Sequence, residues 1–329
     1  MASLKSVMTR LNKAKREEDK IKFIKDHPKD YFVRGAISTG SVFLDLALNG
    51  GFTKGSYNTI VAGGGTGKSS IALLAIKAEF EATGRIGVYY DAEGTLDESY
   101  LERMGVGRHM VLIVKGRNLE DMLNGAEAFS TADEVGVIVM DSIPIFVATS
   151  VEAKGAEEHN MAVEARKYSQ RMPIIEGNCS NRNITIIGIT SFRFDPSAMG
   201  DPRKLSRGAW QYTMSNVILS LTKKDIIKGA DGHPIGHVID ARVLKSKTAP
   251  YNPKEVLKTN FYYEGGFNRY DDYTTLFVEA NIIVRGGAWY SFANGDGEEV
   301  KFQGKEAVIE YLKENEEMFN TLLKRYNGN

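Results

Sequence analysis

The chain has 329 residues, with 42 Lys or Arg balanced by 42 Asp or Glu, so its formal net charge at pH 7 is zero. This balance excludes a bulk basic field as the cause of nucleic-acid binding, which must then depend on local groups of cations. One cysteine, Cys179, excludes an internal disulfide, and no apolar run reaches the roughly 20 residues that a membrane-spanning helix needs. These features predict a cytoplasmic protein that makes no membrane contact.

The first predicted element is a short amphipathic helix at the start of the chain. Leu4, Val7, Met8 and Leu11 recur at helical spacing, and a charged run follows them. Such a helix must bury its apolar face, either on its own domain or on a neighbouring subunit, and the residues alone leave both alternatives open. We predict that residues 1–34 form a helix and linker that contact another subunit.

Residues 35–266 are predicted to form one α/β core. Short, nearly continuous apolar runs alternate with helical stretches, which is typical of strands buried on both faces by helices. Near Val238 the intervening helices stop and strands follow one another closely, as in an antiparallel extension of a parallel-centred sheet. The runs expected to be strands are YNTIVA, IGVYY, MVLIV, GVIVM, ITIIGI, NVILSL, HVIDARVL and TNFYY.

Residues 267–329 are predicted to form a small C-terminal α+β domain. It contains the segment GAWYSF, and a Gly-Asp-Gly turn follows at residues 295–297. The stretch KEAVIEYLKENEEMFNTLLKRY has helical periodicity.

A glycine-rich loop stands between the first core strand, YNTIVA, and the helical stretch SSIALLAIKAEF, which is the context of a phosphate-binding loop. Its backbone N–H groups and the helix N-terminus can bind phosphate oxygens, while Lys68 meets the β and γ phosphates and Ser69 ligates Mg²⁺. Ala62 replaces the first glycine of the strict signature, at a position that needs only a small side chain. The alternative is a flexible turn that resembles the signature by accident. The expected nucleotide-binding residues are Gly63, Gly64, Gly65, Thr66, Gly67, Lys68, Ser69 and Ser70.

Carboxylates at the ends of two other predicted strands complete the expected site. Asp141, at the end of VGVIVMD, is expected to hold Mg²⁺ through water, although an aspartate there is as often a simple turn residue. Glu93, just past the strand that ends in Asp91, is the expected catalytic base that activates water, against the alternative of a solvated acidic loop. Asp97 and Tyr100 are three residues apart, so one can accept from the adenine amino group while the other stacks on the ring.

These residues resemble the RecA-like homologous recombinases, in particular the versions that tailed phages carry. The resemblance is continuous from about Ile37 to Tyr326 and covers most of the chain. It implies a RecA-like phosphate-loop ATPase core with an N-terminal oligomerisation helix and a small C-terminal domain. The segments that carry it are ISTGSVFLDLAL, YYDAEGTLDESY, VIVMDS, GAWYSF and FQGKEAV, and the last two are the most specific because a general phosphate-loop ATPase needs neither.

Carried over position by position, the resemblance implies ATP and Mg²⁺ as cofactors and the roles given above for the phosphate loop, Glu93 and Asp141. It adds Lys245 and Lys247, which match paired lysines that reach the γ-phosphate bound by the adjacent subunit. Tyr263 similarly matches a residue near the neighbour's adenine. Without the family, the K-x-K pattern places both ammonium groups on one face of a strand, where the alternative is a solvated edge strand.

One departure from the family concerns the signal from ATP to DNA. The family usually has a polar pair ending in glutamine after its buried fourth strand, and this glutamine senses the γ-phosphate. Here the pair is Thr190 and Ser191, and a serine is too short to reach as far. The coupling between ATP binding and DNA binding is then expected to depend on Arg193 or on a water molecule, or to be weaker than is usual in the family.

Two loops are expected to bind DNA. The first, residues 151–166, holds two cations and four carboxylates, so its net charge cannot explain phosphate binding. The second, residues 191–208, holds four cations and two carboxylates together with apolar side chains that can wedge between bases. Plain solvation of these charges is the alternative. The expected DNA-binding residues are Met161, Arg166, Arg193, Arg203, Lys204 and Arg207.

The function that follows is an ATP- and Mg²⁺-dependent recombinase that forms filaments on single-stranded DNA and promotes pairing and strand exchange with homologous duplex DNA. The expected setting is a bacterial cell, with a phage gene as one source and a single-strand-binding protein or loader as a further partner. One alternative is a related ATPase that coats or loads DNA without exchanging strands. A hexameric helicase is disfavoured by the C-terminal domain, and a small-molecule kinase would need neither Lys245 nor Lys247.

Overall fold

The computed structural model describes residues 3–13, 15, 20, 22–23, 34–152, 161–194, 202–294 and 297–328, with the side chains of 151–152 and 161–162 left aside. The chain divides into two compact units, Met1–Gly35 and Ala36–Asn329. The first contains the expected helix, α1 (Leu4–Asn12), whose N-cap Ser3 accepts the backbone N–H of Ser6 at 3.2 Å. No residue of α1 is buried, and Leu4 is 64% exposed. Its role in subunit contact stays a prediction.

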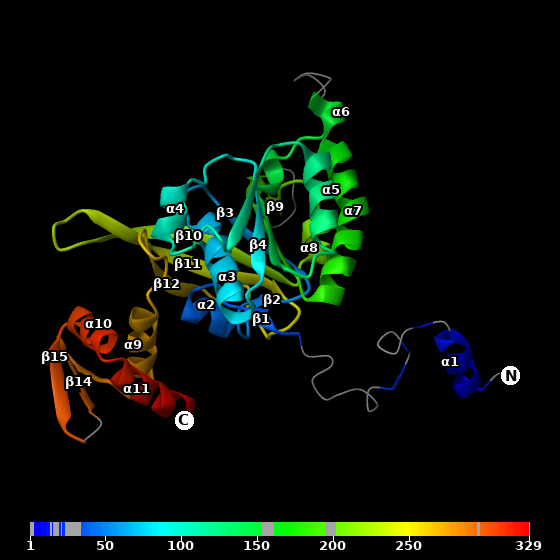
Figure 1. Ribbon diagram of the computed structural model, residues 1–329. Helices are drawn as coiled ribbons and strands as arrows, with labels where there is room; N and C mark the ends of the chain where they lie inside the picture. The colour runs from blue at the N-terminus through cyan, green and yellow to red at the C-terminus, as the bar shows by residue number, and fades with distance from the viewer. Residues whose placement is uncertain are drawn as a thin grey trace. The chain divides into compact units, whose positions relative to one another are not determined.

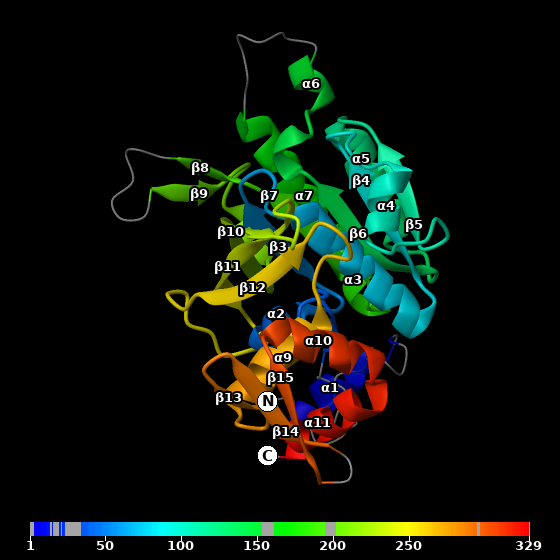
Figure 2. The ribbon, with the colours of Figure 1, turned by 90° about the vertical axis from the view of Figure 1, so that its left-hand side faces the viewer.

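Within the described part of the second unit, eight strands form the central sheet, in the order β12-β11-β10-β3-β7-β6-β4-β5 (Figures 1 and 2). The six strands from β10 to β5 are parallel, while β11 and β12 are antiparallel. The predicted parallel-centred sheet with an antiparallel extension is therefore confirmed. The strands are β3 (Tyr57–Ala62), β4 (Ile86–Asp91), β5 (Val111–Lys115), β6 (Val135–Asp141), β7 (Thr185–Thr190), β10 (Val217–Lys228), β11 (Pro234–Ser246) and β12 (Leu257–Tyr262).

Helices cover both faces of this sheet, which explains why its central strands read as continuous apolar runs. The helix α3 (Lys68–Thr83) lies on one face, while α5 (Leu119–Phe129) and α7 (Met161–Arg182) lie on the other (Figure 1). Every residue of β3, β6 and β7 is buried. Two buried apolar clusters, one on each face, hold the layers together. None of the described helices has the length and apolar character needed to span a membrane.

Short elements connect these layers and extend the ends of the strands. A two-stranded hairpin, β8 (Phe192–Phe194) with β9 (Arg203–Leu205), projects from the core beyond the end of β7 (Figure 2). The helix α8 (Trp210–Met214) follows the hairpin directly and leads into β10. The remaining short elements of the core are β1 (Ala36–Ile37), α2 (Val42–Ala47), β2 (Phe52–Thr53), α4 (Glu98–Arg103), η2 (Ile143–Ile145) and α6 (Thr149–Glu152).

The C-terminal segment has its own apolar cluster, made of residues from Phe277 to Leu322. Its elements are α9 (Arg269–Glu279), β13 (Val284–Gly286), β14 (Trp289–Ala293), β15 (Glu299–Gln303), α10 (Lys305–Glu314) and α11 (Glu316–Gly328). The stretch expected to be continuously helical is two helices, because Asn315 leaves the helical conformation at φ −119° and ψ 69°. The α9 residue Asp272 accepts the backbone N–H of Val42 at 3.0 Å and so ties this segment to α2. The predicted boundary at residue 267 stays a prediction.

Candidate functional site

The phosphate loop joins β3 to α3, as the sequence predicts, and its backbone depends on glycine. Gly65 and Gly67 have φ of +64° and +97°, a region that L side chains rarely adopt. A Cβ at Gly67 would also lie 3.3 Å from the Phe261 ring, whereas a Cβ at Gly63 or Gly64 would meet nothing within 4 Å. The glycines at the loop tip are therefore not needed for packing within the chain, and the space above them is open to a ligand.

Polar contacts inside the loop fit a phosphate group. The Thr66 hydroxyl donates to the Gly63 carbonyl at 3.0 Å, and the Lys68 ammonium donates to the same carbonyl at 2.6 Å. Burial lowers the pKa of Lys68, while the nearby carboxylates of Asp141 and Glu93 act in the opposite sense. The helix N-cap is Gly67, and among the described residues no side chain caps the first N–H groups of α3. A bound phosphate would supply the anion that both the ammonium and these N–H groups can bind.

The predicted metal carboxylate, Asp141, lies beside this loop. Its Oδ2 accepts the Ser69 hydroxyl at 2.6 Å and the Tyr89 hydroxyl at 2.5 Å. Burial raises the pKa of Asp141, the two hydroxyl donors act to lower it, and the Glu93 carboxylate raises it further. Asp141 therefore lies in a buried, hydroxyl-rich environment only one hydrogen bond away from the phosphate loop.

Oxygen ligands of this type fit Mg²⁺, which binds one or two protein side chains and completes its shell with phosphate and water. Ser69 and Asp141 supply a hydroxyl and a carboxylate that lie within hydrogen-bond distance of each other. Among the described residues there is no cluster of three or more His, Cys, Asp or Glu side chains arranged to hold a metal ion. The donor set therefore suits a metal that arrives with a nucleotide better than a permanently bound structural metal.

The strand register distinguishes the roles of the two acidic residues after β4. Asp91 is directly opposite Asp141, but its carboxylate accepts backbone N–H groups from three residues of the next turn, Gly94, Thr95 and Leu96. Glu93 is exposed, and its Oε1 accepts the Ser142 hydroxyl at 3.2 Å. Asp91 therefore holds the turn in place, whereas Glu93 presents its carboxylate at the open edge of the sheet.

The predicted adenine pair, Asp97 and Tyr100, is joined by a local hydrogen bond. Asp97 is the N-cap of α4 and accepts the Tyr100 backbone N–H at 2.8 Å, which lowers the pKa of this exposed carboxyl. The Tyr100 hydroxyl lies 2.8 Å from the hydroxyl of Ser70, and the Arg103 guanidinium lies 5.3 Å from the ring centroid. These contacts connect α4 to the helix that begins at the phosphate loop.

Lys245 and Lys247 both contact the C-terminal end of α8. The Lys245 ammonium donates to the carbonyls of Tyr212 at 2.5 Å and Thr213 at 3.2 Å, and Lys247 lies 3.5 Å from the Met214 carbonyl. Carbonyls in the last turn of a helix have no partner within the helix, and a cation there is favourable. In the isolated chain the lysine pair thus forms a cap on its own helix.

Tyr263, the other residue expected to reach a neighbour, directly follows β12. Its ring centroid lies 5.8 Å from that of His237, and the Lys223 ammonium lies 5.9 Å from the centroid.

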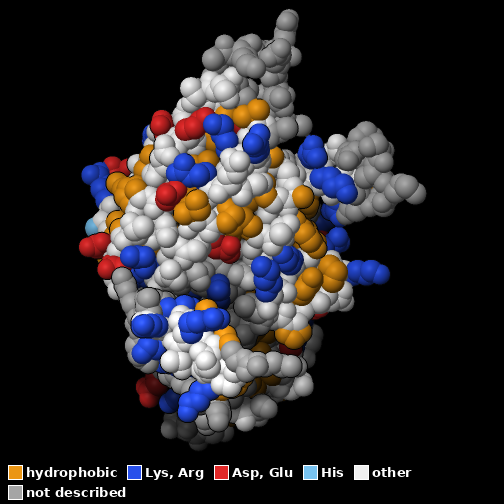
Figure 3. Space-filling model, turned by 90° about the vertical axis from the view of Figure 1, so that its right-hand side faces the viewer, with side chains coloured by type: hydrophobic (Ala, Val, Ile, Leu, Met, Phe, Trp, Pro, Cys, Tyr) orange, Lys and Arg blue, Asp and Glu red, His pale blue; other side chains and the backbone are white. Residues whose placement is uncertain are grey.

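The β8–β9 hairpin concentrates positive charge in a small area. Arg193 and Lys204 are directly opposite each other in its register, and Arg203 is opposite the exposed Phe194. Lys and Arg side chains gather at this side of the molecule in the space-filling view (Figure 3, right). Like charges directly opposite on paired strands are destabilising unless an anion lies near them.

Arg207 differs from the other cations expected to bind DNA. Its guanidinium forms an ion pair with the buried Glu164 of α7 and donates to the Pro144 carbonyl at 2.8 Å. Only 8% of the Arg207 side chain is exposed, so in this conformation it is not available to a phosphate. Its geometry instead supports a structural role, in which it connects the end of the second loop to α7.

The other expected DNA residues are less completely described. Arg166 is exposed on α7, whereas the Met161 side chain and most of the first loop lie outside the described residues. Ser191 lies 3.4 Å from Ser206, hydroxyl to hydroxyl, at the base of the hairpin. Gln211, fully buried in α8, donates to the Ser206 carbonyl. A glutamine therefore does lie near Ser191, although it comes from a different element than the family pattern suggests.

Three contacts at this site were missed by sequence reasoning: Tyr89 with Asp141, Ser142 with Glu93, and Glu164 with Arg207. Ser142 directly follows Asp141, so its position in the sequence could have indicated that it lies at the nucleotide site. Tyr89 lies on the same face of β4 as Asp91, but its contact depends on β4 and β6 being neighbours, which spacing alone does not reveal.

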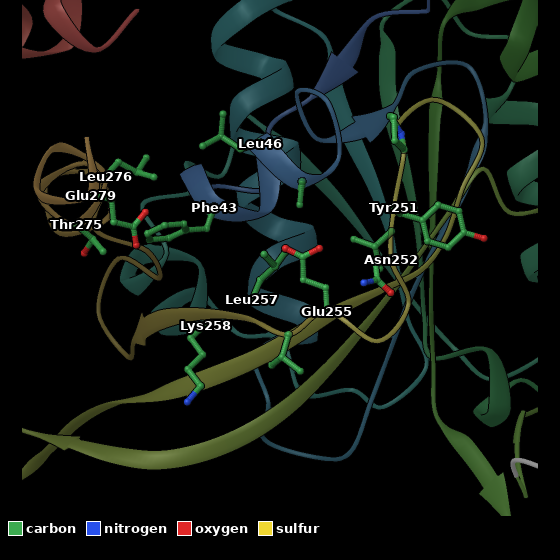
Figure 4. Close-up of a pocket in the computed structure, with 14 residues that line it drawn as sticks. Phe43, Leu46, Tyr251, Asn252, Glu255, Leu257, Lys258, Thr275, Leu276 and Glu279 are labelled. Atoms are coloured by element: carbon green, nitrogen blue, oxygen red, sulfur yellow. The ribbon is translucent and has the colours of Figure 1, made fainter. Parts of the chain in front are cut away.

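A separate hollow, with a volume of about 590 Å³, lies between α2, the chain that enters β12, and α9 (Figure 4). Phe43 of α2 and Leu276 of α9 lie at one end of it, and Tyr251 lies at the other. None of the residues expected to bind nucleotide or DNA lines this hollow. Among the described residues, the side chains expected to bind nucleotide or DNA therefore lie outside this hollow.

Comparisons with known proteins agree with this geometry. The family model of the RecA N-terminal domain matches residues 3–268, and that of the RecA C-terminal domain matches residues 275–326. A protein named Protein RecA from Leptospira meyeri is 31% identical over 282 residues, which span 85% of this chain and 70% of that protein. Protein RecA from Staphylococcus carnosus is 33% identical over 286 residues, which span 86% of this chain and 78% of that protein.

Proposed function

Because this chain belongs to the RecA family, we propose that it acts as a filament on single-stranded DNA and binds each nucleotide between two subunits. It is a DNA-dependent ATPase and an ATP-dependent recombinase, and it binds ATP and DNA and associates with itself. The alternatives of a helicase and of a loading ATPase are not favoured, since family models for both RecA domains match the chain.

One observation carries the assignment of the catalytic residues. The phosphate loop, Asp141 and Glu93 meet at the same edge of the sheet, where the carboxyl ends of the parallel strands β3, β6 and β4 lie. In open α/β sheets ligands bind at this edge. No other part of the described chain combines a lysine in a glycine loop with two carboxylates that have different environments.

We assign the chemistry as follows. Lys68 balances charge on the β and γ phosphates, and the loop N–H groups orient them. Mg²⁺, held through Ser69 and Asp141, would neutralise charge that develops on the phosphate oxygens. Glu93 accepts a proton from the attacking water or orients that water, and Ser142 holds the Glu93 carboxylate in place.

The neighbouring subunit would complete the site. Lys245 lies in β11 and Lys247 follows one residue after its end, and both contact the end of α8, which supports a shared role at the γ-phosphate across the interface. Tyr263 would lie near the neighbour's adenine. Asp97 and Tyr100 would bind the adenine of their own subunit. The N-terminal helix, residues 1–34, would contact the next subunit, while the core (35–266) holds both sites and residues 267–329 form the C-terminal domain.

For DNA, we propose Arg193, Arg203 and Lys204 as phosphate contacts, together with Arg166 and Met161 from the first loop. The cross-strand pair of Arg193 and Lys204 supports this role, because a phosphate between two like charges would remove their repulsion. A single-strand-binding protein or a loader would act as a further partner. Since the relatives come from bacteria, the cytoplasm of a bacterial cell, including a phage-infected one, is the proposed setting.

Strand exchange tests the proposal directly. With a circular single strand and its homologous linear duplex, the protein is expected to form joint molecules and nicked circles when ATP and Mg²⁺ are present. Without ATP, or with a non-homologous duplex, no product is expected. Gel electrophoresis of deproteinised products gives the measurement. An ATPase that coats single strands yet never forms joint molecules would contradict the exchange function.

The hairpin cations make a separate prediction about salt. The variant Arg203→Ala/Lys204→Ala is expected to bind single-stranded DNA more weakly, and its slope of log affinity against log salt should fall by roughly 0.7 for each DNA phosphate that is no longer neutralised. Fluorescence anisotropy of a labelled oligonucleotide at several salt concentrations gives the slope. Lys301→Ala/Lys313→Ala, which removes two exposed cations from the C-terminal segment, is the matched control. An unchanged slope in the hairpin variant would place the DNA phosphates elsewhere.

A further inference from the structure

The buried hydroxyl of Tyr89 contacts the nucleotide site although nothing in the phosphate-loop signature requires a tyrosine on this strand. Tyr89 is fully buried, and its ring packs in the apolar cluster on the α3 face of the sheet. Its Oη donates to Asp141 Oδ2 at 2.5 Å, and the same carboxylate oxygen accepts the Ser69 hydroxyl at 2.6 Å. Tyr89 therefore approaches Asp141 from the protein interior, whereas Ser69 approaches it from the phosphate loop.

We propose that Tyr89 is a positioning residue for Mg²⁺, which acts by fixing the orientation of the Asp141 carboxylate. This inference rests on the proposed function, in which Asp141 and Ser69 hold the metal. Tyr89 itself touches neither nucleotide nor metal, because its hydroxyl is directed at a carboxylate oxygen and the rest of its side chain lies in the core.

Two hydroxyl donors, those of Tyr89 and Ser69, set the orientation of the Asp141 carboxylate. A carboxylate on a side chain rotates about its terminal torsion with little resistance, so its direction is set mainly by hydrogen bonds. Both hydroxyls donate to Oδ2 and so restrict rotation of the Asp141 carboxylate. In the proposed site, Oδ1 would then be the oxygen available to a metal-bound water. Groups that orient a metal ligand in this way typically contribute about 10- to 100-fold to metal affinity.

Rigidity of the donor supports the same conclusion. Tyr89 lies within β4, which pairs with β5 on one side and with β6 on the other, and Asp141 is the last residue of β6. The ring has no room to swing away, because the side chain is completely enclosed. The Ser69 oxygen can ligate a metal ion while its proton stays on Asp141, and the Tyr89 hydroxyl holds the same carboxylate from the interior.

The alternative is that Tyr89 is only a large core residue. The same strand supplies a control for that possibility, because Tyr90 is also buried, at 3% exposure, and its side chain belongs to the opposite apolar cluster. Among the described residues, the Tyr90 hydroxyl has no hydrogen-bond partner. Tyr89→Phe and Tyr90→Phe remove the same atom from adjacent residues. Only the first variant removes a donor from Asp141.

The experiment follows the binding of a fluorescent ATP analogue to the full-length protein while Mg²⁺ is titrated, so that no hydrolysis is needed for the readout. Tyr89→Phe is expected to raise the Mg²⁺ concentration at half-saturation by about 10- to 100-fold. Its thermal unfolding midpoint is expected to stay close to that of Tyr90→Phe. The maximal ATPase rate at saturating Mg²⁺ should be largely kept, so that the change lies in the Mg²⁺ dependence and not in kcat.

A half-saturation point within twofold of that of the wild-type protein would overturn the positioning role. If the wild-type protein itself shows no Mg²⁺-dependent nucleotide binding, the proposed function fails instead, and the two failures are therefore distinguishable. A double-mutant cycle with Asp141→Asn keeps the test decisive if Tyr89→Phe alone lowers stability. Positioning predicts that Tyr89→Phe has little further effect on nucleotide binding in the Asp141→Asn background, and an equal effect in both backgrounds would contradict it.

Discussion

Lys68→Ala is expected to abolish ATP hydrolysis, whereas Glu93→Gln is expected to keep ATP bound and to remain on single-stranded DNA. Lys68 is the only side-chain cation that the structure directs into the phosphate loop, within the described residues, and its ammonium already contacts the loop carbonyl of Gly63. Removing it leaves the charge of the β and γ phosphates without this balance. The Glu93 change leaves the loop, Ser69 and Asp141 intact and removes only the group that activates water.

The two variants should therefore differ in binding although both lose turnover. General base catalysis typically increases the rate of the chemical step by about 10²- to 10⁴-fold. The ATPase rate of Glu93→Gln should therefore be lower than the wild-type rate by a factor in that range. Phosphate release gives the rate, and a filter-binding assay with labelled ATP and a gel shift with single-stranded DNA give the retained complexes. Glu98→Gln, an exposed glutamate on α4 paired with Arg108, is the matched control and should behave as the wild type. Equal loss of ATP binding in the Lys68 and Glu93 variants would refute the separate roles.

The second large effect is expected from changing Lys245 and Lys247 to Ala together. An isolated subunit should keep its ATP affinity, because Lys68 and the loop backbone are unchanged. DNA-stimulated hydrolysis and ATP-dependent filament growth should disappear together, since both need the lysines of the next subunit at the γ-phosphate. Light scattering measures growth and phosphate release measures hydrolysis. Lys224→Ala/Lys228→Ala, two exposed lysines of β10, provides the matched control.

Mixing the double-lysine variant with Glu93→Gln sharpens this test. A filament interface is head-to-tail, so at equal amounts roughly a quarter of the interfaces would combine an intact glutamate with intact lysines from the next subunit. Hydrolysis should then reappear, although each variant alone is inactive. If activity stays absent at every mixing ratio while light scattering shows that the two variants assemble together, Lys245 and Lys247 do not act across the interface.

Much of the fold could be predicted because the amino-acid pattern of the central strands by itself indicates a buried parallel sheet. β3, β6 and β7 are buried on both faces and are therefore apolar along their whole length. The phosphate loop could also be predicted, since its residues are contiguous and lie between a strand and a helix. Glu93 and Asp141 followed from their places just beyond or at the ends of strands that must finish at the same edge of a parallel sheet.

The contacts that could not be predicted are those that depend on strand order and on distant pairing. Tyr89 reaches Asp141 only because β4 and β6 are neighbours, although α4, β5 and α5 separate them in sequence. Arg207 was expected to bind DNA because it lies among loop cations, but a buried glutamate 43 positions earlier pairs with it. Net charge over a loop cannot reveal such a pair, since the count treats a buried, neutralised cation and an exposed one alike.

The cap that Lys245 and Lys247 place on α8 has a thermodynamic consequence for the filament. In the proposed filament, an ammonium group that moves to a neighbour's γ-phosphate would give up contacts with the carbonyls of Tyr212, Thr213 and Met214. Nucleotide across the interface would then compete with the subunit's own helix end, and α8 is the helix that follows the β8–β9 hairpin. If DNA favours the form in which α8 is uncapped, DNA and nucleotide bind cooperatively. By thermodynamic linkage, DNA then raises the affinity for nucleotide by the same factor by which nucleotide raises the affinity for DNA. A reciprocal coupling of this kind needs no glutamine at position 191.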